Sequence, residues 1–522
     1  MTDRAGNVTT IEQQGSYSST KRHLRGSSLL FIGRLFSLIA NFGVQILTVR
    51  YLSKSDYGAL AYALAIVSMG ISVSILGLHR AVPRFVPIYQ EREDHNSAFG
   101  TIVLAIGTIL GIGLSLVALV FGLQGFLTGR VVNDPLSIAL LLIVIGLVPM
   151  GALGNLFEDM LAIFASPRSI FFLRYVLGPC IKLIAILIVI LAHGNAHMLA
   201  YAQLIGGLAG LVIYIAILHR VMKKRGLFER LNLKTIRMPV REIFSFSIPL
   251  LSHDAFLIIK ATVAVMLLEY FRGTTDVAEF RAVVPIAGLC LVVLQSLKSL
   301  YTPIASRLFA RKETDGINDL YWQSAIWITL ITFPVFAVCL FLSEQVTVLL
   351  FGTRYSEAAI LLAILSIGTF FNAALGLNAY TLQVFAKVRF ITWMNIVAAI
   401  TALTLYLWLI PLYGALGAAI ATTGAVVVHN LLIHSGLLLG TGVDVFNLRY
   451  LKVYGTVLIS ILGLLLVNTI YTPPTFITIV LLTLVSLLLF IVNRNVLSIG
   501  STFPEISRVP VLRRLLGVQS NI

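Results

Sequence analysis

Long apolar segments alternate with short polar ones along nearly the whole chain. A helix needs roughly 20 mostly apolar residues to cross a bilayer. By that criterion about fourteen spans are expected, at 28–51, 58–79, 100–123, 136–162, 170–192, 197–220, 245–268, 277–301, 321–343, 357–384, 390–412, 414–439, 451–470 and 475–493. The eleventh and twelfth are nearly continuous, and the turn-forming sequence PLYGALG divides them. The pattern predicts an all-α polytopic membrane protein.

Basic residues lie mainly on alternate loops. With the N-terminus placed in the cytoplasm, the inside segments carry 28 of the 38 Lys and Arg residues and the outside segments carry six. Basic loops stay on the cytoplasmic side of a membrane. The alternation predicts a multi-pass protein of the cell membrane with both termini in the cytoplasm.

Composition narrows the function classes. The chain is 58% hydrophobic and 11% charged, which excludes an ordinary soluble protein. Most of the basic residues behind the net charge of +16 lie in the loops between spans. The distribution of these loops explains the charge, so we expect no nucleic-acid partner. Its three cysteines, Cys180, Cys290 and Cys339, have no metal-ligand or redox spacing, and we expect no metal and no cofactor. The outside loops are too short for a catalytic domain, and no phosphate-binding G-x-x-x-x-G-K-[ST] loop exists, so we expect no enzyme and no catalytic residues.

The chain repeats itself weakly. The segment that begins at Ala165 resembles the one that begins at Ala386, and nearly the same offset relates other pairs of segments. We therefore expect two six-helix lobes in parallel pseudo-repeat plus two C-terminal helices, with a substrate site between the lobes near the midplane. The expected parts are a disordered cytoplasmic tail (1–27), an N-terminal six-helix lobe (28–220), a basic cytoplasmic linker (221–244), a C-terminal six-helix lobe (245–439), two extra transmembrane helices (450–493) and a basic amphipathic cytoplasmic tail (494–522).

The span that opens the second half carries His253, Asp254 and Lys260 within a long apolar run. A charge in lipid costs at least about 2.5 kcal/mol, so such residues usually face a protein interior or a wet cavity. Lys260 lies about 22 Å into its span, and His253 shares its helical face. His253 could equally be a satisfied buried histidine. Asp254 needs a basic partner, for which Arg34 is a candidate, and is either structural or coupled to a cation.

The first span carries a polar stripe at helical spacing, formed by Arg34, Ser37, Asn41, Gln45 and Thr48. It either lines a cavity, or it consists of packing residues together with an arginine that reaches the inner headgroups.

Two further lysines lie inside spans. Lys182 shares a face with Arg174 and either lines the path or pairs with Glu158 or Asp159. Lys298 either lines the path or extends to the nearby membrane surface. The predicted substrate path comprises Arg34, Asn41, Gln45, Lys182, His253, Asp254, Lys260 and Lys298.

The basic residues inside the spans outnumber the one deeply placed acid, Asp254, so the path should be electropositive. Such a cavity suits a phosphate or pyrophosphate group.

Four sequences carry a family resemblance: LTVRYLSKSDYGALAYA at 47–63, FSIPLLSHDAF at 246–256, FGTRYSEAAILLAIL at 351–365 and LIPLYGALGAAIATTGAVVV at 409–428. In these segments the chain resembles the polysaccharide and oligosaccharide flippases of the multidrug/oligosaccharidyl-lipid/polysaccharide (MOP) exporter superfamily. The resemblance implies alternating access and export of a lipid-linked oligosaccharide on a prenyl phosphate or pyrophosphate carrier. It also implies membrane lipid, and glycosyltransferases or a glycan transferase of the same pathway, as partners.

Two alternatives stay open. A multidrug/cation antiporter of the same superfamily should favour acidic groups in its cavity. A membrane glycan polymerase or ligase should carry a sizeable outside loop.

Overall fold

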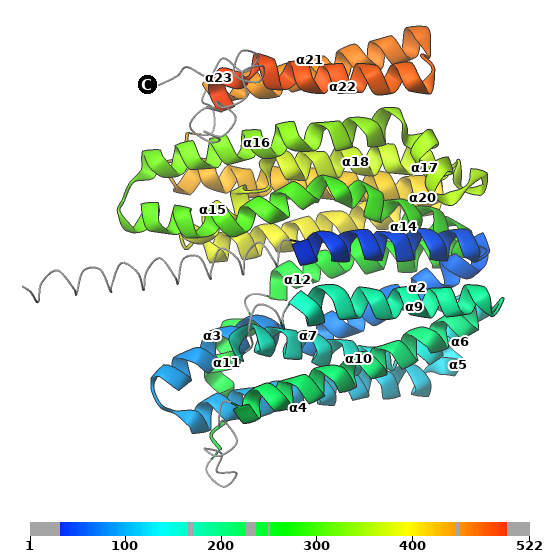
Figure 1. The fold of residues 1–522 in the computed structure, drawn as a ribbon, viewed down its shortest axis with the longest axis vertical. Coiled ribbons are helices and arrows are strands. Elements are labelled where there is room, and N and C mark those ends of the chain that lie inside the picture. Colours follow the sequence, from blue (N-terminus) through cyan, green and yellow to red (C-terminus); the bar gives the residue numbers. More distant parts are fainter. Residues whose placement is uncertain are drawn as a thin grey trace, which may run out of the picture. The chain divides into compact units, whose positions relative to one another are not determined.

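The computed structural model describes residues 32–164, 169, 171–224, 236–248, 251–444 and 448–497. Within these ranges the chain is helical almost throughout, and the only β-pairing is a single bridge between Thr128 and Val132. The predicted all-α membrane fold is therefore confirmed (Figure 1). The predicted tail 1–27, part of the linker 221–244 and most of the tail 494–522 lie outside the described residues.

The chain divides into two compact units, Met1–Asp254 (unit 1) and Ala255–Ile522 (unit 2). The helices of unit 1 are Ile32–Tyr51, α2 (Lys54–Ile75), α3 (Leu78–Glu91), α4 (His95–Gly122), α5 (Gln124–Leu127), α6 (Pro135–Val144), α7 (Leu147–Phe164), η1 (Phe171–Leu177), α9 (Gly178–Leu191), α10 (Ala196–Lys224) and α11 (Val240–Ser247). The division falls inside α12 (Leu251–Ile258), directly after Asp254.

The helices of unit 2 are η4 (Ile259–Val263), α13 (Ala264–Arg272), α14 (Thr274–Ala287), η5 (Gly288–Leu291), α15 (Val292–Ala310), α16 (Thr314–Phe341), α17 (Ser343–Phe351), η6 (Thr353–Tyr355), α18 (Ala358–Leu375), α19 (Asn378–Val384), α20 (Val388–Gly440), α21 (Leu448–Tyr471), α22 (Thr475–Val492) and α23 (Arg494–Leu497). In each unit the long helices lie side by side (Figure 1).

Thirteen helices in the described residues are long and apolar enough to cross a membrane. One of them, α20, has 53 residues and would be about 80 Å long if straight, against a hydrocarbon core of about 30 Å. It is broken at Gly414, where φ is 58° and ψ is −132°. This residue lies in the predicted turn, so α20 supplies two spans. The expected number of about fourteen is confirmed.

Two other spans differ in detail from the prediction. The segment expected as one helix at 136–162 consists of α6 and α7, which meet at residues 145 and 146. The second span continues past its expected end at 79, because α3 extends it to Glu91. The join between α2 and α3 has left-handed backbone at Leu76 and Gly77, a common way for a helix to end.

Small residues let the helices of unit 1 pack closely. A Cβ atom on Gly70 of α2 would lie 2.7 Å from Cγ2 of Val148 on α7, and one on Gly151 would lie 2.6 Å from Cδ1 of Ile71. Because lipid is as apolar as the side chains, membrane helices are held together largely by such close packing. The buried core of unit 1 forms around α3, α4, α7 and α10.

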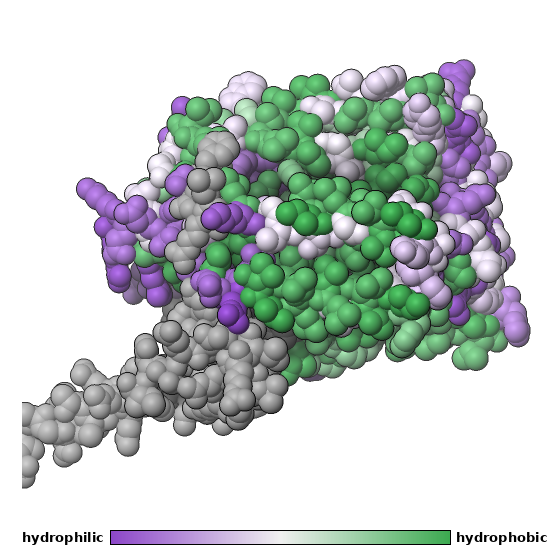
Figure 2. All heavy atoms as spheres, turned by 90° about the horizontal axis from the view of Figure 1, so that it is seen from above, coloured by the Kyte–Doolittle hydropathy of each residue, from purple (hydrophilic) through white to green (hydrophobic). Residues whose placement is uncertain are grey.

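Aromatic contacts join α21 to α16 in unit 2. The Trp322 ring stacks on Tyr450 with centroids 5.5 Å apart, and its Nε1–H donates to the Asp444 carbonyl at 2.8 Å. Beyond this seam the pair α21 and α22 exposes apolar side chains, among them Leu458, Ile459 and Leu487. Figure 2 shows apolar residues covering the middle of this face, with hydrophilic residues gathered at its two ends, as expected for a surface in contact with lipid.

The same pair of segments is tied together in each unit. In unit 1, the Tyr51 hydroxyl at the end of the first helix donates to the Gly194 carbonyl at 2.7 Å, between α9 and α10. In unit 2, Arg272 at the end of α13 donates to the Pro411 and Leu412 carbonyls at 2.7 and 2.8 Å, beside the break in α20. The correspondence supports the internal repeat.

Candidate functional site

An ion pair joins α3 to α12 in unit 1. Arg80 Nη2 lies 2.7 Å from Asp254 Oδ1, and the two side chains are 32% and 18% exposed. The expectation that Arg34 is the partner of Asp254 was therefore wrong. Sequence reasoning missed Arg80 because it lies 174 residues away along the chain.

Three further contacts hold α11 and the segment before it along α3 and α4. Tyr89 donates to Glu242 Oε2 at 2.7 Å, and the Arg84 guanidinium lies 4.4 Å from the ring centre of Phe246. A side chain at Gly100 of α4 would clash with the Arg237 carbonyl. α11 therefore runs antiparallel to α3 at one end of unit 1 (Figure 1).

Two buried polar atoms lie in the segments next to this ion pair, at His79 of α3 and at Ser247 of α11. In the described part of the chain, His79 Nδ1 and Ser247 Oγ have no hydrogen-bond partner. Ser247 packs on Gly77, two residues before His79, with its carbonyl oxygen 3.2 Å from the position of a Cβ atom there. Buried polar atoms are normally paired, so these two atoms could form further hydrogen bonds where α3 meets α11. His253, beside Asp254, is exposed.

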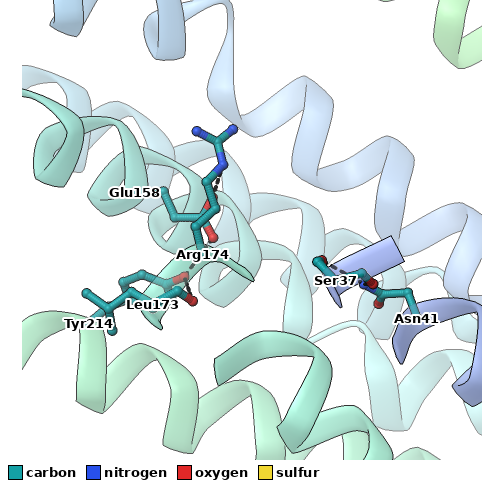
Figure 3. A network of polar contacts seen from close by, with 6 residues as sticks. All are labelled: Ser37, Asn41, Glu158, Leu173, Arg174 and Tyr214. Atoms are coloured by element: carbon teal, nitrogen blue, oxygen red, sulfur yellow. Dashed lines mark hydrogen bonds and ion pairs between the residues drawn. The ribbon is translucent and has the colours of Figure 1, made fainter. Parts of the chain in front are cut away.

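The polar stripe of the first helix is partly used in local contacts. Asn41 donates to the Ser37 carbonyl at 2.7 Å (Figure 3), and Thr48 donates to the Val44 carbonyl at 2.7 Å. Gln45 donates to the Tyr57 hydroxyl of α2 at 2.5 Å, and Arg34 is exposed. A place in the substrate path stays a prediction for Arg34, Asn41 and Gln45.

A second charged network joins α7, η1 and α10. Glu158 accepts from the Tyr214 hydroxyl at 2.7 Å and lies 3.5 Å from Arg174 Nε (Figure 3). Lys182 is exposed and forms no ion pair with any described residue. Arg174 is the direct ion-pair partner of Glu158, whereas Lys182 interacts with Glu158 electrostatically and without a direct ion pair. Both alternatives for Lys182 therefore stay predictions. Arg174 lies in a π-helical segment, whose wider turn breaks the spacing on which the shared face with Lys182 was based.

Lys260 lies in a second π-helical segment, η4. Its side chain is half-buried, and within the described residues the ammonium group makes no hydrogen bond and no ion pair. Its carbonyl accepts from the Tyr406 hydroxyl at 3.2 Å. Single π-helical turns inside membrane helices are frequent at functional sites.

Lys298 of α15 lies with Nζ 5.0 Å from the ring centre of Tyr380 on α19. A cation over an aromatic face is stabilised by the ring quadrupole. A place in the substrate path stays a prediction for Lys298.

Sequence reasoning gave no weight to a buried amide network in unit 2. Asn430 of α20 donates to Asn372 Oδ1 at 3.1 Å, and Asn378 donates to the Asn430 carbonyl at 3.2 Å. A second pair on α20 joins His429 Nε2 and Asn395 Oδ1 at 2.9 Å. Their irregular spacing along the chain gave no signal. No group of His, Cys, Asp or Glu suited to hold a metal ion occurs among the described residues.

A family model described as "Polysaccharide biosynthesis protein" matches residues 23–309, more than half of the chain. The chain belongs to this family. A second model, MatE, matches residues 252–408. Together the matches confirm the resemblance to the polysaccharide flippases of the MOP superfamily.

Two related proteins are each 22% identical to this chain. The capsular polysaccharide biosynthesis protein CapF of Staphylococcus aureus aligns over 403 residues, 77% of this chain and 95% of its own length. The uncharacterized membrane protein MJ1068 of Methanocaldococcus jannaschii aligns over 423 residues, 78% of this chain and 82% of its own length.

Solved structures show the same fold. The lipid II flippase MurJ in an inward closed conformation gives a TM-score of 0.66 at 17% identity, covering 90% of this chain and 99% of that one. An inward-facing multidrug resistance MATE family transporter of the MOP superfamily gives a TM-score of 0.64 at 14% identity, covering 76% of this chain and 93% of that one. This family member therefore has the fold of these two membrane proteins, and its candidate spans make it a multi-pass membrane protein.

Proposed function

We propose that the protein is a flippase that moves a lipid-linked oligosaccharide, on a prenyl phosphate or pyrophosphate carrier, from the cytoplasmic to the outer face of the cell membrane. Alternating access carries the glycan and its charged group across, while the prenyl tail stays in the bilayer. The product serves surface polysaccharide synthesis or protein glycosylation.

The observation that carries the proposal is the state of Lys260. Its half-buried side chain lies within a membrane-spanning helix, and the ammonium group makes no ion pair with the described residues. A cation at such a depth needs compensation, which an anionic cargo can supply during transport.

The acids of unit 1 support an anionic cargo over a cationic one. Asp254 pairs with Arg80, and Glu158 lies beside Arg174, so each of these carboxylates already has a cationic partner. Lys260 has no such carboxylate partner among the described residues. The balance favours an electropositive path.

The second candidate is a multidrug/cation antiporter, favoured by the MatE match over residues 252–408. Its cargo would be repelled by Lys260, so replacing this lysine by a neutral residue should leave such transport intact or improve it. The flippase is favoured over a polymerase or ligase, because the structural neighbours named for a function are a flippase and a transporter.

Lys260→Ala should lower the appearance of lipid-linked glycan at the outer face by at least about tenfold, because roughly 1.4 kcal/mol of lost cargo stabilisation is enough for that factor. The measurement is surface labelling of glycan in cells that depend on this protein, with protein abundance followed by immunoblot. Lys260→Arg keeps the charge and should retain partial export. Lys223→Ala, at the exposed end of α10, is the matched control. Full export by Lys260→Ala at normal abundance would overturn the proposal.

A further inference from the structure

The Arg80–Asp254 pair lies beyond the part of the second span that fills a bilayer core. α2 and α3 together run for 38 residues, about 57 Å at 1.5 Å per residue, against a core of about 30 Å. Counted from Lys54, roughly 20 residues bring the chain close to the break at Leu76 and Gly77. The first turns of α3, with Arg80, therefore lie at the level of the lipid headgroups.

Two arginines of α3 face α11 and α12. Arg80 and Arg84 are four residues apart, so their side chains are neighbours on one helix face. Arg80 pairs with Asp254, whereas the Arg84 guanidinium lies over the rings of Phe85 and Phe246. The face thus presents two guanidinium groups, of which one is held by a carboxylate and the other by aromatic rings.

The surroundings can donate additional hydrogen bonds. His79 Nδ1 and Ser247 Oγ lie where α3 meets α11, buried and without a partner in the described residues. A serine hydroxyl and an imidazole nitrogen can each donate to an oxygen of an anion. Phosphate oxygens, with charge and several acceptor sites, match two arginines flanked by such donors.

We propose that Arg80 and Arg84 form a recognition site for the phosphate or pyrophosphate group of a lipid carrier, in which Asp254 holds Arg80 until the anion replaces it. The inference rests on the proposed function and identifies residues that would load its cargo. The exchange gives Arg80 a phosphate oxyanion in place of a carboxylate and leaves the Asp254 carboxylate, which is only 18% exposed, without its cation, so Asp254 lowers the affinity for the anion. It also releases the start of α12, the helical segment that continues into η4 and Lys260. Binding of cargo at the headgroup level thereby frees the helix that carries the cation of the path.

The test uses the purified full-length protein in phosphatidylcholine nanodiscs, with farnesyl pyrophosphate as the lipid probe and inorganic pyrophosphate as the soluble one. Asp254→Asn removes the competitor and should bind farnesyl pyrophosphate about tenfold more tightly. Arg80→Gln and Arg84→Gln should each bind about tenfold more weakly, because each loses a charge-assisted contact. Arg92→Gln, an exposed arginine just after α3, is the matched control and should bind as the native protein does.

The opposite signs expected for Asp254→Asn and Arg80→Gln distinguish this site from a purely structural pair. If both variants weaken binding and lower the melting temperature together, the pair is structural and the inference fails. If farnesyl pyrophosphate binds but no variant changes its affinity, this site is wrong while the proposed function stands. Equal affinity for inorganic pyrophosphate would overturn the assignment to a lipid carrier. Failure of the native protein to bind either probe would overturn both the site and the proposed function.

Discussion

Charged side chains within the spans are compensated by different kinds of partner. Asp254 has an arginine partner, Glu158 has an arginine and a tyrosine, and Lys298 lies over an aromatic ring. Lys260 has none of these contacts with the described residues. Since an uncompensated charge in a membrane is costly, this difference marks Lys260 as the residue to alter first.

At the edge of the membrane, Asp94 caps the start of α4. Its carboxylate accepts from the Ser97 backbone N–H at 3.0 Å, and the hydrogen bonds from Ser97 lower the pKa of Asp94 below its usual value. The cap therefore adds stability above the ordinary aspartate pKa of about 3.9 and loses it as pH falls through the lower folded-state pKa. Asp94→Ala should destabilise the protein by about 1 kcal/mol at pH 7.

The difference in melting temperature between native and Asp94→Ala protein, measured in detergent from pH 7 to pH 3, checks this expectation. The difference should be constant above about pH 5 and shrink below about pH 4. Glu91→Ala, on the same surface, serves as the control. A difference that grows as the pH is lowered would contradict the assigned cap.

Helix breaks are the main departures from simple spans. α2 ends at a left-handed Leu76 and Gly77, and α20 is interrupted at Gly414. Each break redirects a chain that would otherwise be too long for the membrane. Each of the two π-helical segments changes the direction in which the side chains after it point. The residue spacing of an ideal α-helix therefore predicts shared faces only within stretches that contain no π-helical segment.

Gly414→Ala should destabilise unit 2 by about 1–3 kcal/mol, because a positive φ is costly for alanine and the new methyl group would clash with Asp276. The readout is the melting temperature of the purified protein together with its yield. Gly107→Ala is the matched control, since Gly107 lies inside α4 with no neighbour close to an added Cβ. There alanine should be neutral or stabilising. Equal behaviour of the two variants would refute the role of Gly414.

At the scale of the whole molecule, both units tie the end of their first long helix to the turn before their last core helix. Such paired contacts are what a duplicated six-helix bundle should retain, even where the residues differ. With the predicted six spans in each bundle, both bundles would start on the same side of the membrane. The predicted orientation depends on the distribution of basic loops.

That orientation can be measured with single cysteines and a membrane-impermeant maleimide. Arg130→Cys, exposed after α5, should be labelled on intact cells. Arg311→Cys, exposed between α15 and α16, should be labelled only after permeabilisation. The native protein gives the background from Cys180, Cys290 and Cys339. Labelling of Arg311→Cys alone on intact cells would reverse the proposed topology.

The sequence by itself determined the class of protein, the approximate number of spans and the turn at Gly414. These depend on local properties: the length of apolar runs, which must match the bilayer thickness, and the backbone freedom of glycine. It also singled out Lys260, because one charge in an apolar run is visible without knowledge of its neighbours.

Only the tertiary structure decided which charges meet. Arg80 finds Asp254, and Arg174 finds Glu158, through the packing of helices distant in the chain or shifted by a π-helical turn. Hydrophobic patterning specifies that a helix is buried in lipid or protein but not which neighbour it contacts. Partners across helix interfaces depend on packing angles, breaks and close glycine contacts, and those arise only when the whole bundle assembles.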